Sequence, residues 1–292
     1  MEKMLRNKTA IILFVLPALL IFLLIIMVPI LFSGYYSLQE WDGIGPGSFV
    51  GFDNYVKMFS DDSGGFVKAA VNSFILVGFS VFIQLPFALL LALILATGVK
   101  GENALRTIYF IPVIISTVVI GQLWMKIYHP NYGLLNVFFN AVGLDELAHP
   151  WLADPNTALV AVIIPIVWQY IGYHMLLMYA SIKSIPTSIF EAAKIDGASN
   201  VATAFKITIP LIKPILKVCT VFAIVGSLKS FDLIYIITNG GPLHSSEVPS
   251  TLMFNTIFHQ YKYGYGSAMS IFIVLECLVL AMIVQKVFKT DD

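Results

Sequence analysis

The sequence predicts an all-α integral membrane protein with six transmembrane helices. Hydrophobic residues make up 58% of the 292-residue chain, charged residues only 12%, and the mean hydropathy is +0.86. A soluble chain carries about 25% charged residues to cover its surface. Most of this chain is therefore expected to lie out of contact with water, and the distribution of its charges indicates where the helices cross the bilayer.

Four spans follow directly from charge-free stretches. A helix needs roughly 20 apolar residues to cross a bilayer. No Asp, Glu, Lys or Arg occurs within residues 9–39, 69–99, 107–125 or 155–182. These stretches predict spans near residues 10–33, 71–97, 107–127 and 157–182.

Two further spans carry charges inside otherwise apolar sequence. One is predicted near 214–237 and contains Lys229 and Asp232; the other is predicted near 266–286 and contains Glu276. The six spans form one transmembrane domain. Its expected limits are 10–287, with short terminal segments at 1–9 and 288–292.

The basic residues predict the orientation of the chain, because short cytoplasmic loops accumulate Lys and Arg. With both termini in the cytoplasm, twelve basic residues lie inside, four outside, and Lys229 lies within the membrane. The inside set is Lys3, Arg6, Lys8, Lys100, Arg106, Lys183, Lys194, Lys206, Lys213, Lys217, Lys286 and Lys289. We therefore expect a multi-pass protein of the cell membrane with a polar cytoplasmic loop at 184–213.

This cytoplasmic loop contains the segment EAAKIDGASNVATAFKITIP, residues 191–210. Ser188 followed by Glu191 is a capping-box pattern that predicts a short helix starting there. Gly197 is expected to end this helix, and Ser199 to cap a second helix that reaches Pro210. The product is either a docking site for another protein or an amphipathic linker on the membrane surface.

The spacing within this loop resembles a known motif. Glu191, Ala192 and Ala193, then Gly197, then Ile207 and Pro210 match the "EAA" pattern E-A-A-x3-G-x9-I-x-L-P of binding-protein-dependent ABC importers, with isoleucine in place of leucine at 209. Other segments resemble the carbohydrate-uptake subfamily, in particular its maltose-transporter-like first permease subunit. They are GLLN at 133–136, WLADP at 151–155, SIPTSIFEAAKIDGAS at 184–199, FDLIYIITNGGP at 231–242 and YGYGSAMS at 263–270.

The resemblance implies a type I ABC importer permease that forms half of a transmembrane path for sugar uptake. The implied partners are a second homologous permease, two ATPase subunits and an extracytoplasmic solute-binding protein. In such importers the EAA loop seats in a cleft of the ATPase. The residues expected to couple this chain to the ATPase are Glu191, Ala192, Ala193, Asp196, Gly197 and Pro210.

The sequence gives no support to an enzymatic function. No glycine is followed by lysine, so the P-loop pattern G-x-x-x-x-G-K-[ST] is absent, and no H-E-x-x-H, cysteine-pair or G-x-S-x-G motif occurs. The chain is therefore expected to be no enzyme and to bind no metal or cofactor itself, with ATP and Mg held by partner ATPase subunits.

A substrate path is expected where ionisable or polar groups lie inside spans, since such groups usually face the protein interior or a watery cavity. Lys229 and Asp232, three residues apart, share a face of a regular helix and either neutralise each other or line the path. Gln169, Gly172 and Tyr173 also share a helical face. Glu276 either joins Lys229 and Asp232 or lies nearer the inner membrane interface. Gln84, His174 and Asn239 are further hydrogen-bonding groups that suit a hydroxyl-rich solute, and Trp168 and Tyr170 could stack on a sugar ring.

Two readings stay open for the segment Gly240, Gly241 and Pro242. Its composition is typical of a tight turn after a helix end, whereas the family resemblance places it toward the binding protein. Trp41, Trp124 and Trp151 are expected to lie at the membrane interfaces. An alternative to the ABC importer is a stand-alone carrier that uses Lys229, Asp232 and Glu276 for ion coupling; a receptor or scaffold without transport is a third class.

Overall fold

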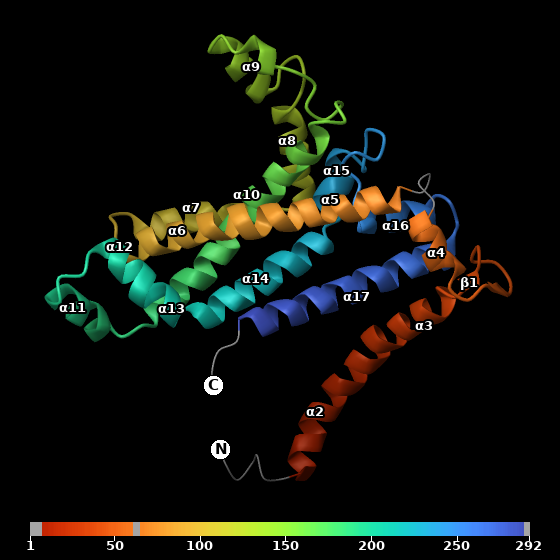
Figure 1. Cartoon of the computed structure of the whole chain (residues 1–292), viewed down its shortest axis with the longest axis horizontal. Coiled ribbons are helices and arrows are strands. Elements are labelled where there is room, and N and C mark those ends of the chain that lie inside the picture. Colours follow the sequence, from red (N-terminus) through yellow and green to blue (C-terminus); the bar gives the residue numbers. More distant parts are fainter. Residues whose placement is uncertain (1–7, 61–64, 289–292) are drawn as a thin grey trace. The chain divides into compact units, whose positions relative to one another are not determined.

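The computed structural model describes residues 8–60 and 65–288 of the chain. Helices dominate it, and the only strands in these ranges form one short hairpin, so the predicted all-α class is confirmed (Figure 1). Most of the expected terminal segments 1–9 and 288–292 lies outside the described residues, as do Lys3, Arg6 and Lys289. The chain divides into two units, residues 1–64 with 253–274 and residues 65–252 with 275–292.

The first unit begins with an apolar helix. α2 (Lys8–Phe22), the π-helical turn η1 (Leu23–Met27) and α3 (Val28–Tyr36) follow one another without a break, and Ile12–Tyr36 is long and apolar enough to cross a membrane. Every side chain from residue 12 to residue 27 is exposed. A helix that is hydrophobic on all sides requires lipid or another protein around it.

Polar contacts fix the chain after α3. β1 (Gln39–Glu40) pairs antiparallel with β2 (Ser48–Phe49), and α4 (Asp53–Ser60) follows. The buried Asn54 amide donates to the carbonyl oxygens of Ser37 and Gln39, at 2.9 and 2.8 Å. The unit is completed by most of α16 (Pro249–Phe258) and the first half of α17 (Tyr263–Val287), where the Gly264 N–H donates to the Trp41 carbonyl at 3.1 Å.

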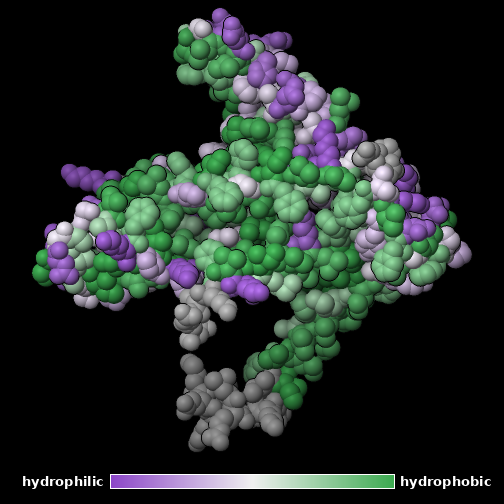
Figure 2. Space-filling view, in the orientation of Figure 1, coloured by the Kyte–Doolittle hydropathy of each residue, from purple (hydrophilic) through white to green (hydrophobic). Residues whose placement is uncertain are grey.

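The second unit is built on long helices. α5 (Phe66–Phe79), the π-helical turn η3 (Ser80–Gln84) and α6 (Leu85–Ala96) form one helical rod, which lies against α10 (Ala158–Lys183). α14 (Lys213–Leu228) packs on both. Figure 2 shows the hydrophobic surface of these helices and the hydrophilic residues that gather at the end where α10 leads into the 184–213 loop.

The predicted third span is sharply bent. α7 (Glu102–Ile114) and α8 (Thr117–Ile127) meet at 96°, with an extended Ile115 and a non-helical Ser116 between them. Residues 113–117 read VIIST, and β-branched residues and serine have low helix propensity. Among the described residues, five helices are long and apolar enough to cross a membrane, or six when the bent pair counts as one span, in agreement with the predicted six.

The predicted fifth span is also interrupted. α14 ends at Leu228, and α15 (Asp232–Ile237) begins after three intervening residues. The expectation that Lys229 and Asp232 share one helical face is therefore wrong, because residues 229–231 leave the helix. Lys229 follows the end of α14, and Asp232 is the first residue of α15.

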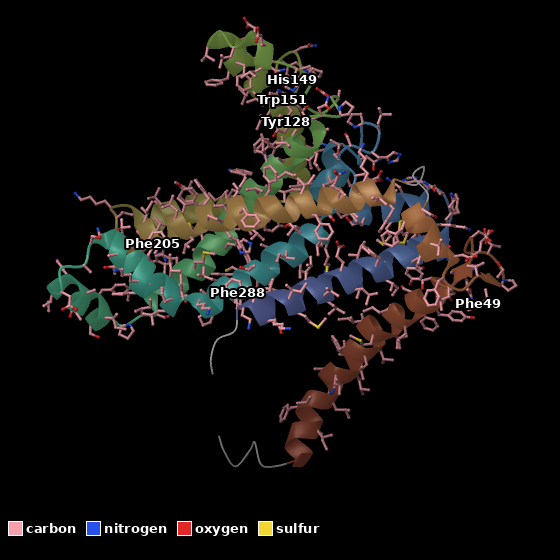
Figure 3. The ribbon with its side chains drawn as sticks, in the orientation of Figure 1. Phe49, Tyr128, His149, Trp151, Phe205 and Phe288 are labelled. Atoms are coloured by element: carbon pink, nitrogen blue, oxygen red, sulfur yellow. The ribbon has the colours of Figure 1, made fainter. Side chains whose placement is uncertain are left out.

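Two of the segments that resemble the carbohydrate-uptake subfamily, GLLN at 133–136 and WLADP at 151–155, contact each other after α8. α9 (Leu134–Ala141) and the 3-10 turn η4 (Asp145–Leu147) precede the WLADP segment. The Trp151 indole N–H donates to the Asn136 Oδ1 at 2.7 Å, and the Asn136 amide donates to the carbonyls of Pro130 and His149 at 3.0 and 3.1 Å. His149 and Trp151 lie close together in this segment (Figure 3), with ring centroids 4.0 Å apart.

Candidate functional site

The 184–213 loop is helical over most of its length. It consists of α11 (Thr187–Ile195), α12 (Asn200–Thr203), the π-helical turn η5 (Ala204–Thr208) and α13 (Ile209–Leu211). The predicted capping box is wrong, since α11 begins at Thr187, one residue before Ser188, and has no side-chain cap. Pro186 before the helix has a fixed φ and restricts Ile185 to an extended conformation, which defines the helix start without a capping side chain.

Gly197 ends α11 as predicted. Its φ is +76°, a left-handed conformation that favours glycine. The Ala198 N–H donates to the Ala193 carbonyl at 2.9 Å, and the Gly197 N–H donates to the Lys194 carbonyl at 3.1 Å. This pair of bonds is a Schellman motif, which ends the helix and gives partners to two of its last carbonyl groups.

The second predicted helix start is also confirmed. The Ser199 hydroxyl accepts a hydrogen bond from the Ala202 N–H at 3.2 Å. Helical residues then continue past Pro210 to Leu211.

The family-like residues of this loop are mostly exposed. Glu191, Ala192, Asp196, Gly197 and Pro210 are exposed, and only Ala193 is buried. Large apolar side chains are exposed among them as well, namely Ile195, Val201 and Phe205, the last of which is labelled in Figure 3. Large apolar side chains exposed in this way are typical of a segment that contacts another protein or the membrane surface.

A cavity of about 320 Å³ lies within the second unit. η3, α8, α10, α14 and α15 all contribute to its wall. Of the residues predicted for the substrate path, the cavity brings together Gln169, Tyr173, Lys229 and Asp232. Gln84, Tyr170 and His174 line it too, and Ser80, Thr117 and Phe222 are lining residues that the sequence did not single out.

Buried polar atoms in this wall lack partners. The Gln169 Oε1 and His174 Nδ1 atoms have no hydrogen-bond partner among the described residues, although both side chains are almost fully buried. Buried polar groups are normally hydrogen-bonded, and each exception calls for an explanation such as a bound solute. Lys229 and Asp232, which both belong to the described residues, form no ion pair with each other.

Gly172 and Glu276 do not line the cavity. Gly172 lies against α7, where a Cβ atom would overlap the carbonyl group of Tyr109. Its place on the face of α10 beside Gln169 and Tyr173 therefore serves close helix packing. Glu276 is buried in α17, and neither of its carboxyl oxygens has a partner in the described residues.

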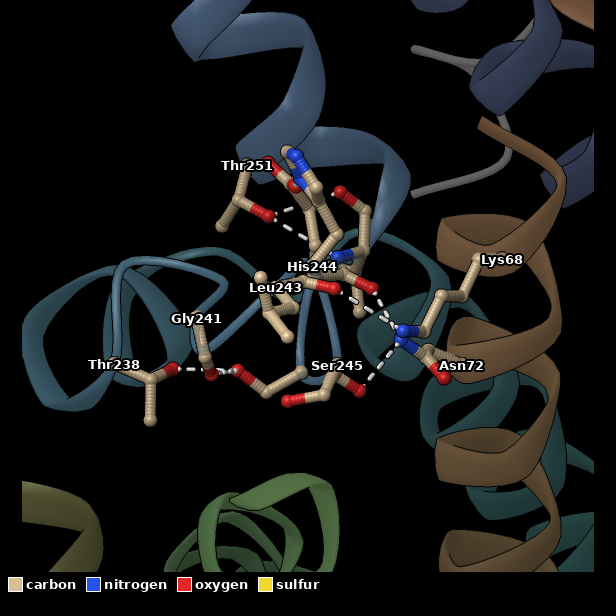
Figure 4. A network of polar contacts seen from close by, with 11 residues as sticks. Lys68, Asn72, Thr238, Gly241, Leu243, His244, Ser245 and Thr251 are labelled. Carbon is tan, nitrogen blue, oxygen red and sulfur yellow. Dashed lines mark hydrogen bonds and ion pairs between the residues drawn. The ribbon is translucent and has the colours of Figure 1, made fainter. Parts of the chain in front are cut away.

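The segment after α15 forms a closely held loop, residues 238–248 (Figure 4). Gly240 has a φ of +81°, and the Ser246 hydroxyl donates to the Gly241 carbonyl at 2.6 Å. From α5, Lys68 donates to the Leu243 carbonyl at 3.1 Å and Asn72 donates to the Ser245 and Glu247 carbonyls at 3.0 and 2.8 Å. The turn reading of Gly240, Gly241 and Pro242 thus has a structural basis.

The architecture agrees with that of known transport proteins. The family model described as "binding-protein-dependent transport system inner membrane component" matches residues 63–290. This chain belongs to that family. It is thus a multi-pass membrane permease of the ABC transporter class, as the EAA spacing predicted.

Similarity to individual members extends over almost the whole chain. The probable ABC transporter permease protein YurN of Bacillus subtilis is 38% identical over 98% of both chains. The trehalose/maltose transport system permease protein MalF of Thermococcus litoralis is 34% identical over 96% of this chain and 94% of its own. A crystal structure of a bacterial ABC transporter involved in the import of the acidic polysaccharide alginate superimposes with a TM-score of 0.83 at 26% identity, covering 98% and 97% of the two chains.

Proposed function

We propose that this chain is the maltose-transporter-like first permease subunit of an ABC importer for a sugar. It forms half of a transmembrane path, and a second homologous permease forms the other half. ATP hydrolysis on two partner subunits drives transport, and those subunits bind the ATP and Mg. The chain itself is no enzyme and binds no cofactor.

The observation that carries this proposal is the geometry of the 184–213 loop. α11 follows the end of α10 after only three residues, and a Schellman motif at Gly197 presents Ile195, Val201 and Phe205 at the surface. The twelve basic residues that favour this side support a cytoplasmic location with both termini inside. We infer that the ATPase binds here, and that the 238–248 loop, on the opposite side of the membrane, faces the solute-binding protein.

The side chains that line the cavity favour a hydroxyl-rich solute. Its neutral amide and hydroxyl groups suit a sugar, and Tyr173 offers a ring on which a sugar can stack. The names of the relatives point the same way, since MalF is a trehalose/maltose transport system permease protein and the structural neighbour belongs to a transporter involved in the import of alginate. Lys229 and Asp232, on the cavity wall but unpaired with each other, are available to a solute.

Two matched glycines test the proposal. Gly197 and Gly143 have nearly the same left-handed backbone, with φ of +76° and +77°, and open space around their α-carbons. Valine at either position costs about 1–2 kcal/mol of local strain. In vesicles containing the chain and its partner subunits, we expect Gly197→Val to lower ATP-dependent uptake of labelled mono- and disaccharides strongly and Gly143→Val to leave it nearly unchanged.

Three results would overturn the proposal. The first is full ATP-dependent uptake by a chain that carries bulky residues at both Glu191 and Gly197. The second is purification of an active carrier without any ATPase, with uptake abolished by an uncoupler, which would favour the ion-coupled carrier. The third is normal sugar uptake by cells that lack the chain, which would instead favour the scaffold.

A further inference from the structure

Four polar side chains join three helix ends next to the 184–213 loop. The Tyr179 hydroxyl donates to the Glu102 carboxylate, and Lys183 Nζ lies 3.7 Å from Glu102 Oε2. Lys183 also donates to the Ala96 carbonyl at 3.2 Å, and the Arg106 guanidinium lies 4.8 Å from the centre of the Tyr179 ring. Glu102, Arg106, Tyr179 and Lys183 are called the α7–α10 cluster below.

Helix electrostatics favour this arrangement. Glu102 is the first residue of α7, where the helix dipole stabilises a negative charge, and Lys183 is the last residue of α10, where it stabilises a positive charge. Ala96 is the last residue of α6, so its carbonyl has no partner within that helix. The cluster therefore gives the Ala96 carbonyl at the end of α6 a hydrogen-bond donor, and it joins the start of α7 to the end of α10.

α7 and α10 touch at a second place. Gly172 lies seven residues before Tyr179 on α10, which is about 10 Å along the helix. There the two backbones approach so closely that any Cβ atom on Gly172 would overlap the Tyr109 carbonyl. Two separate contacts, one steric and one polar, fix both the distance and the register between the two helices.

The two helices connect the candidate coupling loop with the cavity. The end of α10 leads into α11 through residues 184–186, so a displacement of α11 acts first on Lys183 and Tyr179. The other end of α7 leads through the 96° bend into α8, whose first residue, Thr117, lines the cavity. Gln169 of α10 lines the same cavity.

We propose that the α7–α10 cluster transmits movement of α11 to the cavity by making α7 and α10 move as one body. This inference rests on the proposed function, because the force on α11 comes from the ATPase. Glu102 and Tyr179 act as positioning residues and touch neither solute nor nucleotide. Without their contact only the steric contact at Gly172 remains, and α7 and Thr117 follow the movement of α10 in part.

A cysteine reporter tests this transmission without requiring the sugar. In the complete complex, Cys219 and Cys277 are replaced by alanine and Thr117→Cys is introduced as the only cysteine of this chain. The rate of labelling by N-ethylmaleimide is measured with and without MgATP and vanadate, and ATP hydrolysis is measured in parallel. Tyr179→Phe removes the hydroxyl and keeps the ring beside Arg106, and Glu102→Gln removes the charge that faces Lys183.

We expect each substitution to reduce the nucleotide-induced change in labelling by a factor between about 2 and 30, while ATP hydrolysis continues. The double variant should be no worse than the stronger single one, since both remove the same contact. Tyr132→Phe and Glu146→Gln, on exposed residues outside the cluster, serve as matched controls and should change nothing.

A full labelling response in the double variant would overturn the inference, and so would a proportional loss of labelling response and hydrolysis, which indicates general damage. Failure of the complex with an intact cluster to recruit an ATPase would overturn the proposed function itself, and the inference with it.

Discussion

The Asn72 amide of α5 donates hydrogen bonds to the carbonyl oxygens of Ser245 and Glu247, at 3.0 and 2.8 Å (Figure 4). These bonds hold a strained loop, because Leu243 and His244 both have positive φ, at 50° and 58°. Backbone strain of this kind costs on the order of 1–3 kcal/mol per residue and persists only where surrounding contacts fix the conformation. The 238–248 loop is therefore held in one shape by a helix far from it in sequence.

Asn72→Asp should release this loop. The substitution keeps the shape of the side chain but removes both donors and places a carboxylate against two carbonyl oxygens. Leaving buried acceptors unpaired costs about 1–3 kcal/mol each. We expect faster hydrogen–deuterium exchange at residues 238–248, measured by mass spectrometry on the solubilised chain, and no change for Asn131→Asp on an exposed residue. Unaltered exchange in Asn72→Asp would show that other contacts hold the loop.

Gly172→Ala should destabilise the chain and Gly226→Ala should not, although both glycines lie within long helices. A Cβ atom on Gly172 would overlap the Tyr109 carbonyl, whereas one on Gly226 meets nothing within 4 Å. Overpacking costs about 1–3 kcal/mol, while alanine improves helix propensity by up to about 1 kcal/mol. The thermal midpoint in detergent is expected to fall for Gly172→Ala and to stay or rise for Gly226→Ala. Equal midpoints would contradict the close packing of α10 on α7.

The sequence was informative where local rules decide the structure. The helical class follows from hydropathy, and the turn at Gly197 and the cap at Ser199 follow from residue types that adopt one local conformation. The capping box at Ser188 failed because Pro186 already fixes the start of α11 one residue earlier. Lys229 and Asp232 were placed on one helix because periodicity cannot show where a helix stops.

Local rules of this kind do not predict contacts between segments that are distant in the sequence. Glu102 and Tyr179 are 77 residues apart, and Asn72 and Ser245 are 173 residues apart. Nothing in the neighbourhood of either pair predicts its partner, since the pairing depends on how the helices pack. The cavity illustrates both cases: Gln169 and Tyr173 were expected from their spacing, whereas Ser80 and Phe222 come from other helices and gave no local signal.

Phe205→Asp should weaken binding of the ATPase without unfolding the chain. Phe205 is 68% exposed in the 184–213 loop, so a charge there has little effect on the fold of the isolated subunit. Loss of one large apolar contact at an interface corresponds to about 1.5–3 kcal/mol, or roughly 10- to 100-fold in affinity. Phe49→Asp is the matched control, since Phe49 is 74% exposed but lies in the other unit. Recovery of the ATPase by affinity purification measures the effect, and equal recovery with both variants would exclude Phe205 from the contact.

Gln169→Leu should separate stability from transport. The Gln169 Oε1 atom is buried at the cavity without a partner in the described chain, and an unpaired buried polar atom destabilises a fold. Leucine has a similar volume and no polar atom, so the thermal midpoint should stay or rise. Because the amide is proposed to bind the solute, the half-saturating sugar concentration should increase about 2- to 10-fold. This is the effect of losing one hydrogen bond of about 0.5–1.5 kcal/mol. Gln122→Leu, on the exposed side of α8, should alter neither quantity. A lower midpoint with unchanged uptake would mean that Gln169 supports the fold and does not contact the solute.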